Sequence, residues 1–180
     1  NGDNSIFVQK FNADGTTTGN TPVTLEGIPT GIDFTPQITA LANGEYVITW
    51  FAYTPDWSTT SVYVQKFNAD GTITGNNPVT LEGVPNGQDQ NSQITTLSNG
   101  SYVVTWNGTD VNGDNSIFVQ KFNANGTTTG NNMVTIEGIP TGYDQEPQIT
   151  ALANGEYVVT WHGTDVNGDN SIFVQKFNAN

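Results

Sequence analysis

The side chains best suited to chemistry lie in a short loop that occurs twice, as DVNGDNS. Asp110, Asn112 and Asp114 stand at alternate positions of the first copy. The second copy repeats them as Asp165, Asn167 and Asp169. Oxygen ligands on alternate residues are how calcium-binding loops wrap the ion, as in D-x-[DN]-x-[DN]-G. The two loops therefore predict calcium as a cofactor, held by these six residues.

Two departures from that pattern leave an alternative open. Gly113 and Gly168 come one place earlier than the loop glycine of calcium sites, and no glutamate follows where such loops carry a bidentate ligand. The alternative is that Asn112-Gly113 is simply a hairpin turn with polar flanks. The corresponding loop of the preceding unit, FAYTPDWSTTS, lacks the pattern, so an ion in every unit is not expected.

Carboxylates also recur at two other places in each unit. The recurring residues are Asp33, Asp89 and Asp144, with Glu26, Glu82 and Glu137. Such a set could line a channel or bind cations. The alternative is that each Asp accepts hydrogen bonds from the backbone of its own turn.

Tryptophans occur at two kinds of position. Trp50, Trp106 and Trp161 each end a β-rich run, so we expect them in the core or between units. Trp57 lies instead in the atypical loop TPDWSTT, which makes it the candidate for an exposed ligand contact.

Residues for catalysis are scarce. The chain has no Cys and no Arg, and His162 is its one histidine, at a place taken by Phe51 and Asn107 in the other units. We expect His162 in an exposed loop and not as a base. A carboxylate pair for glycoside hydrolysis stays open, but near-identical copies disfavour it, because an active site is one asymmetric place. The sequence therefore predicts a protein that is not an enzyme.

Composition limits the partners. The 180 residues carry a net charge of −13 with four Lys, so neither nucleic acid nor an anionic membrane surface is expected. An acidic surface does suit divalent cations. No apolar run reaches the roughly 18 residues of a membrane helix, so no membrane insertion is expected.

An internal repeat governs the organisation. Trp50, Trp106 and Trp161 are 56 and 55 residues apart, and the VQKF motif keeps the same period. A fixed period of this size indicates a stacked or radial repeat architecture. We divide the chain into a half unit (1–35), two repeat units (36–90 and 91–146) and a partial unit (147–180).

Each full unit contains four strand candidates. PQITALANGEYVITW is two β-rich runs around Asn43-Gly44, which predicts a hairpin with a two-residue type I′ turn. SVYVQKFN follows, then TITGNNPVTLEG, where Gly75 and two Asn indicate an irregular or bulged outer strand. Runs apolar on both faces should be covered on both sides. The prediction is an all-β fold of antiparallel propeller-type blades; a β-trefoil, a β-solenoid and a row of small sandwich modules are alternatives.

The segments DQEPQITALANGEYVVTW and DQNSQITTLSNGSYVVTW carry a family resemblance. They resemble the tandem repeats of about 50 residues in large secreted bacterial proteins, the RTX-type, type I-secreted adhesins and haemolysin-type calcium-binding proteins. The resemblance covers essentially the whole chain, although the nonapeptide G-G-x-G-x-D is missing. It implies secretion and display at the cell surface.

Together these features predict an extracellular structural or adhesive module of a bacterial surface or matrix protein. We expect it to associate with copies of itself or adjacent repeats, as a closed ring or a filament, through its terminal strands (5–12 and 171–178). A carbohydrate-binding lectin with one glycan site per repeat is the alternative. A fragment of a secreted hydrolase is a third possibility.

Overall fold

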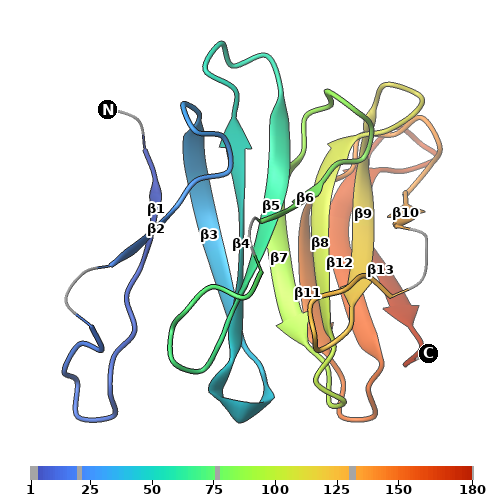
Figure 1. Cartoon of the computed structure of the whole chain (residues 1–180). Helices are drawn as coiled ribbons and strands as arrows, with labels where there is room; N and C mark the ends of the chain where they lie inside the picture. Colours follow the sequence, from blue (N-terminus) through green and yellow to red (C-terminus); the bar gives the residue numbers. More distant parts are fainter. Residues whose placement is uncertain (1–3, 20–21, 76–77, 130–132, 180) are drawn as a thin grey trace.

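The computed structural model describes all residues except 1–3, 20–21, 76–77, 130–132 and 180. The described residues form four antiparallel sheets and one 3-10 turn at Ala42–Gly44, with no α-helix among them. Figure 1 shows the sheets following one another in chain order. The predicted all-β fold of tandem antiparallel units is confirmed. In this described part, no helix is long and apolar enough to cross a membrane.

Each sheet corresponds to one blade or part of one. The half-blade contains β1 (Ile6–Val8) and β2 (Val23–Leu25). Blade A contains β3 (Ile32–Ala40), β4 (Tyr46–Tyr53), β5 (Thr60–Phe67) and β6 (Val79–Leu81). Blade B contains β7 (Gln90–Thr96), β8 (Tyr102–Thr109), β9 (Asn115–Phe122) and β10 (Val134–Ile136). Blade C contains β11 (Gln145–Ala151), β12 (Tyr157–Thr164) and β13 (Asn170–Phe177).

The first strands of blades A, B and C lie together. β7 contacts both β3 and β11. The second, third and fourth strands of each blade lie successively farther from this contact, in the order in which they pair. This is the radial arrangement of propeller blades, in which the first strand of every blade faces the axis. We call β3, β7 and β11 the inner strands.

The core lies between consecutive blades. Ile117 and Val119 of β9 pack against Tyr157, Val159 and Trp161 of β12, and these contacts repeat between the other sheets. Every residue of β5 is buried, as a strand covered on both faces requires. The tryptophans expected in the core are there: Trp50 and Trp106 are fully buried and Trp161 nearly so.

The Asn-Gly pairs lie in hairpins, but the predicted two-residue turn is wrong. In blade A, Asn43 and Gly44 are both left-handed as predicted (φ 64° and 78°), but the Leu41 N–H donates to the Glu45 carbonyl (2.8 Å), so three residues form the loop. In blade B the Leu97 N–H donates to the Ser101 carbonyl (2.8 Å) and the Gly100 N–H donates to the Leu97 carbonyl (2.9 Å). Asn99 keeps an ordinary φ while Gly100 is left-handed, at +82°. A type I turn followed by a left-handed glycine also matches the twist of antiparallel strands, and it explains the longer loop.

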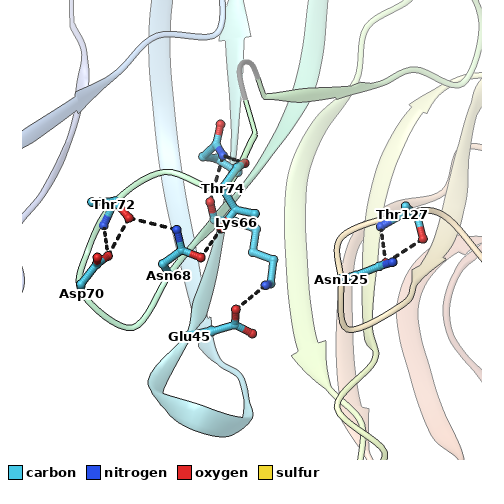
Figure 2. A network of polar contacts seen from close by, with 9 residues as sticks. Glu45, Lys66, Asn68, Asp70, Thr72, Thr74, Asn125 and Thr127 are labelled. Carbon is cyan, nitrogen blue, oxygen red and sulfur yellow. Dashed lines mark hydrogen bonds and ion pairs between the residues drawn. The ribbon is translucent and has the colours of Figure 1, made fainter.

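The outer strands are short. β2, β6 and β10 have three residues each, and Asn76 and Asn77, expected to interrupt the outer strand of blade A, lie outside the described residues. The preceding loop is closed by side chains, as Figure 2 shows: the Thr72 N–H and Oγ1–H both donate to Asp70 Oδ1 (2.9 and 2.6 Å). Asn125 and Thr127 form the same turn in blade B. Beside them Lys66 Nζ pairs with Glu45 Oε1 at 2.7 Å.

Candidate functional site

Each inner strand contains one bulge at the same level. The pairing with the second strand shifts between Phe34 and Gln37 in blade A, and at the equivalent places in blades B and C. One residue inside each bulge is left-handed: Thr35 (φ 45°), Asn91 (54°) and Glu146 (52°). Bulges re-aim side chains and are frequent next to active sites.

Our sequence interpretation missed these bulges. It predicted an irregular or bulged strand only in the outer strand, because Gly75 and two Asn interrupt that segment. The available signal was proline: Pro36 and Pro147 follow the left-handed residues directly. Because proline cannot donate to the ladder, within a sheet it is confined to edges, strand starts and bulges.

The three bulges surround a pocket of about 230 Å³. Its main lining residues are the left-handed residues and the glutamines that follow them, namely Thr35, Asn91, Glu146, Gln37, Gln93 and Gln148. We call it the inner-strand pocket. Its lining is polar, with amides and the hydroxyls of Thr35 and Ser92 as hydrogen-bond partners and a single carboxylate, that of Glu146. Such groups suit a neutral ligand rich in hydroxyls.

Glu146 has the one histidine as its neighbour. Its carboxylate is 68% exposed, and Oε2 lies 3.8 Å from His162 Nδ1. The expectation of an exposed loop for His162 is wrong, because the residue lies within β12 with its side chain 27% exposed. Cross-strand pairing with Gln145, beside the bulge, brings the imidazole to Glu146.

Asn107 occupies in blade B the position that His162 has in blade C. Its Oδ1 accepts hydrogen bonds from Asn91 Nδ2 (3.0 Å) and from the Glu146 N–H (3.4 Å). The Asn107 side chain is buried, at 6% exposure, and thus fixes both bulges at the edge of the pocket. The equivalent residue of blade A, Phe51, stacks on Phe34 instead.

The recurring aspartates do not line the pocket. Asp33, Asp89 and Asp144 are buried, and each accepts a hydrogen bond from the indole N–H of its own blade's tryptophan at 2.7 to 2.8 Å. Each also accepts from the backbone N–H of a glycine six residues earlier. They tie the connection between blades to the second strand, which is a structural role wider than the capping of a local turn.

Burial controls the titration of these aspartates. It raises the pKa of Asp33 to about 6 and that of Asp89 to about 7, against hydrogen bonds from Gly and Trp that lower it. Burial raises the pKa of Asp144 as well. One oxygen in each of Asp33 and Asp89, Oδ2, is buried without a hydrogen-bond partner. In the folded protein the carboxyl of Asp33 therefore keeps its proton below about pH 6 and that of Asp89 below about pH 7.

Two glutamates of this recurring set, Glu82 and Glu137, also have structural partners. Glu82 Oε1 accepts from Ser61 Oγ at 2.7 Å, and Glu137 Oε1 accepts from Ser116 Oγ at 3.0 Å. Both bonds join the connection after the fourth strand to the third strand of the same blade. Glu82 and Glu137 are therefore not free to line a channel.

The two candidate calcium loops are ordered by their first aspartate. Asp110 Oδ1 accepts the backbone N–H groups of Asn112 (2.7 Å) and Asp114 (3.3 Å). In the second loop, Asp165 Oδ1 accepts those of Asn167 (2.8 Å) and Asp169 (3.1 Å). Such turns occur with and without an ion. Across the described residues no group of three or more His, Asp or Glu converges as a metal site would, and calcium binding stays a prediction.

Trp57 lies at the rim of blade A. Its side chain is 52% exposed, and its ring packs on Tyr53 (4.8 Å between centroids) and on Phe34 (6.2 Å). Its backbone is left-handed at φ 61°, which is strained for a bulky residue. A ligand contact by Trp57 stays a prediction, although the exposure that it requires is present.

Comparison with known proteins identifies the fold but no family. No protein-family model matches the sequence, and no curated protein sequence matches it. The α-L-arabinanase of Penicillium chrysogenum in complex with arabinobiose aligns over 99% of this chain and 56% of its own length, with 11% identity and a TM-score of 0.64. The GH93 α-L-arabinofuranosidase of Fusarium graminearum with arabinobiose aligns over 99% and 55%, with 12% identity and a TM-score of 0.59.

A third similar structure is a putative exo-β-1,3-galactanase from Bifidobacterium bifidum, with 15% identity, a TM-score of 0.53 and coverage of 96% of this chain and 59% of that one. The chain thus spans a little over half the length of these structures. They are β-propeller glycosidases, and they confirm the propeller-type blades.

The comparison corrects two expectations. The resemblance to RTX-type adhesin repeats is wrong, because the matching structures are propeller glycosidases and no family model of any kind matches. The expectation of a protein that is not an enzyme is contradicted too, because the arabinanase and the arabinofuranosidase that share the fold are sugar-cleaving enzymes. At 11 to 15% identity the likeness establishes the fold alone.

Proposed function

We propose that the chain is part of a carbohydrate-active β-propeller that binds a neutral oligosaccharide in the inner-strand pocket. In this proposal Glu146 supplies one of the two carboxylates that glycoside hydrolysis commonly uses. The observation that carries the proposal is the set of three bulges at one level, which turn Glu146 and a ring of amides into one pocket.

The second carboxylate of such a pair does not come from the described lining of this pocket, where Glu146 is the one acid. Thr35 and Asn91 occupy the equivalent positions in blades A and B. Because the chain covers little more than half of the glycosidases that it matches, we propose that a further blade of the complete ring supplies it.

A lectin with one equivalent site per repeat fits this geometry less well. The three left-handed bulge residues differ chemically, as do the residues beside them, Phe51, Asn107 and His162. A site built from them is unique to one place in the ring. Secretion and the association of copies through exposed terminal strands stay predictions of the sequence.

The test measures binding and hydrolysis separately. Arabinobiose, longer arabino-oligosaccharides and β-1,3-galactotriose are titrated by calorimetry, and their cleavage is followed by chromatography. Glu146→Gln keeps the side-chain shape, so binding is expected to persist while cleavage by the complete protein falls by a factor of about 100 or more, the usual contribution of an acid–base group.

The control is Glu156→Gln, which changes a glutamate of the hairpin at the opposite end of blade C, where its carboxylate, 18% exposed, pairs with Lys176 at 2.7 Å. The equivalent residue in blade B is Ser101, so the backbone there does not require a carboxylate. Its cleavage rate should equal that of the wild type. No binding of any probe would refute the proposal, and cleavage unaffected by Glu146→Gln would refute the role of Glu146.

A further inference from the structure

Blade B has a second, larger pocket at its rim, with a volume of about 410 Å³. We call it the side pocket. It lies between the loop after β8 and the connection that leads into β11, and its lining includes Gln88, Gln90, Asn107, Thr109, Asn115 and Tyr143. This volume is within the range of small-molecule sites.

The same place in blade A is filled by aromatic rings. Sheet pairing makes Phe34 the counterpart of Gln90, Phe51 that of Asn107 and Tyr53 that of Thr109. The three rings pack with centroids 5.6 to 5.9 Å apart. Replacing them with amides and a hydroxyl therefore exchanges an apolar filling for an open polar pocket on the same backbone.

Trp57 completes the filling of blade A, and Gly113 is its counterpart. The Trp57 N–H donates to the Thr54 carbonyl (2.8 Å), and the Gly113 N–H donates likewise to the Asp110 carbonyl (3.1 Å). Both residues are left-handed, at 61° and 86°. A glycine takes this conformation without strain, and at Gly113 it also leaves room, because no atom lies within 4 Å of a Cβ built there.

The lining of the side pocket favours a neutral sugar residue. Amides supply both donors and acceptors for hydroxyl groups, and Tyr143, 56% exposed, supplies an aromatic wall. Asp114 also lines the pocket, and its Oδ1 is buried without a hydrogen-bond partner. No lysine lines the pocket, so an anionic sugar would meet a carboxylate with no compensating cation.

Asn107 joins the side pocket to the inner-strand pocket. It lines the side pocket, and its Oδ1 accepts hydrogen bonds from Asn91 and from the Glu146 backbone, both in the lining of the inner-strand pocket. A chain of sugars that passes Glu146 can therefore continue over Asn107 without leaving the protein surface. We propose that the side pocket is a subsite for a further neutral sugar residue of the oligosaccharide, an inference that rests on the function proposed above.

Amide chemical shifts in ¹⁵N-labelled protein locate the two sites separately. Arabino-oligosaccharides and β-1,3-galacto-oligosaccharides, from di- to pentasaccharide, serve as probes. The expected result is that disaccharides shift the amides of Asn91 and Glu146, and that longer probes of the same series also shift those of Asn115 and Tyr143. Shifts at the inner-strand pocket alone would overturn the subsite and leave the proposed function intact. Shifts at the side pocket alone would overturn the proposed function, and none at either would overturn both.

The variant Gly113→Trp fills the side pocket in the way that blade A does. It is expected to weaken the binding of the longest probe about tenfold and to leave disaccharide binding unchanged. Gly168→Trp is the matched control: it has φ 83°, open space around a built Cβ and the equivalent place in blade C. Its affinities should equal those of the wild type.

Tyr143→Gln provides a second measurement that does not depend on how the introduced tryptophan side chain packs or on whether Gly113→Trp folds. Gln88 occupies the equivalent position in the preceding unit, so glutamine is compatible with the local backbone. Loss of the aromatic wall should again weaken only the longer probes. If Gly113→Trp and Tyr143→Gln both bind the pentasaccharides as tightly as the wild type, the subsite is refuted.

Discussion

The replacement Asp89→Asn tests whether the buried aspartates hold protons in the folded protein. Asp89 Oδ1 accepts hydrogen bonds from Trp106 Nε1 at 2.8 Å and from the Gly83 N–H at 2.9 Å, while Oδ2 is buried without a partner. Asparagine retains the accepting oxygen and cannot ionise. It therefore removes the titration of Asp89 with little change in the packing around Trp106.

The sign of the effect follows from the direction of the pKa shift. Burial raises the pKa of Asp89 from 3.8 to about 7. Between these values the folded protein binds a proton that the unfolded chain has released, so the free energy of unfolding falls as the pH rises through this window and is level above it. Between pH 5 and pH 8 the pH rises by about two units before it reaches the folded-state pKa of about 7, so the free energy of unfolding falls by about 3 kcal/mol.

Urea unfolding at pH 5 and pH 8 measures this contribution, with the wild type and the variant compared at both. Between pH 5 and pH 8 the free energy of unfolding of the wild type is expected to fall by about 3 kcal/mol more than that of Asp89→Asn. The control is Asp70→Asn, because Asn125 forms the same turn in the next blade, as Figure 2 shows. Equal pH dependence in the wild type and Asp89→Asn would refute a protonated Asp89.

Three further outcomes are expected. If the loops Asp110–Asp114 and Asp165–Asp169 hold calcium, EDTA should lower the melting temperature and calcium should restore it; an unchanged melting temperature would contradict calcium as a structural ion. Trp57→Gly, which installs the residue of the other loops, should weaken oligosaccharide binding several-fold in calorimetry, whereas unchanged affinity would leave Trp57 only its packing on Tyr53. Light scattering should detect association of copies through β13, because its Ile172 and Val174 side chains are 74% and 64% exposed. The double variant Ile172→Ser, Val174→Ser should abolish this association. A wild-type protein that stays monomeric at all concentrations would contradict it.

The fold was predictable because its determinants are local and repeated. The period of Trp50, Trp106 and Trp161 indicates stacked or radial units. The Asn-Gly turns indicate hairpins, and the runs apolar on both faces indicate strands covered on both sides. The type of hairpin turn was not predictable in the same way. Asn-Gly is compatible both with a two-residue turn and with the longer turn that ends in a left-handed Gly100, and the pairing of Leu97 with Ser101 decides between them.

The candidate site was only partly visible in the sequence, because it depends on contacts between units. Nothing local relates Glu146 to Asn107, which lies 39 residues earlier and approaches it only when blades B and C pack together. The role of Asp89 was likewise hidden, since Asp89 lies in the connection before β7 and its partner Trp106 lies 17 residues away on β8. The dipeptides Thr35-Pro36 and Glu146-Pro147 were the readable signal for the bulges.

Near-identity of the units does not exclude a single asymmetric site, because the units differ where the bulges lie. The residues that build the blade, such as the paired Asp and Trp, are the same in all three units. The differences lie at one end of the inner and second strands. Thr35, Asn91 and Glu146 occupy the same bulge position in the three blades. At the rim beside them, blade A has packed aromatic rings, whereas blade B has polar residues. A repeated frame with a differentiated rim is what a single asymmetric site requires, because the frame supplies stability at every blade while only the rim contacts a ligand.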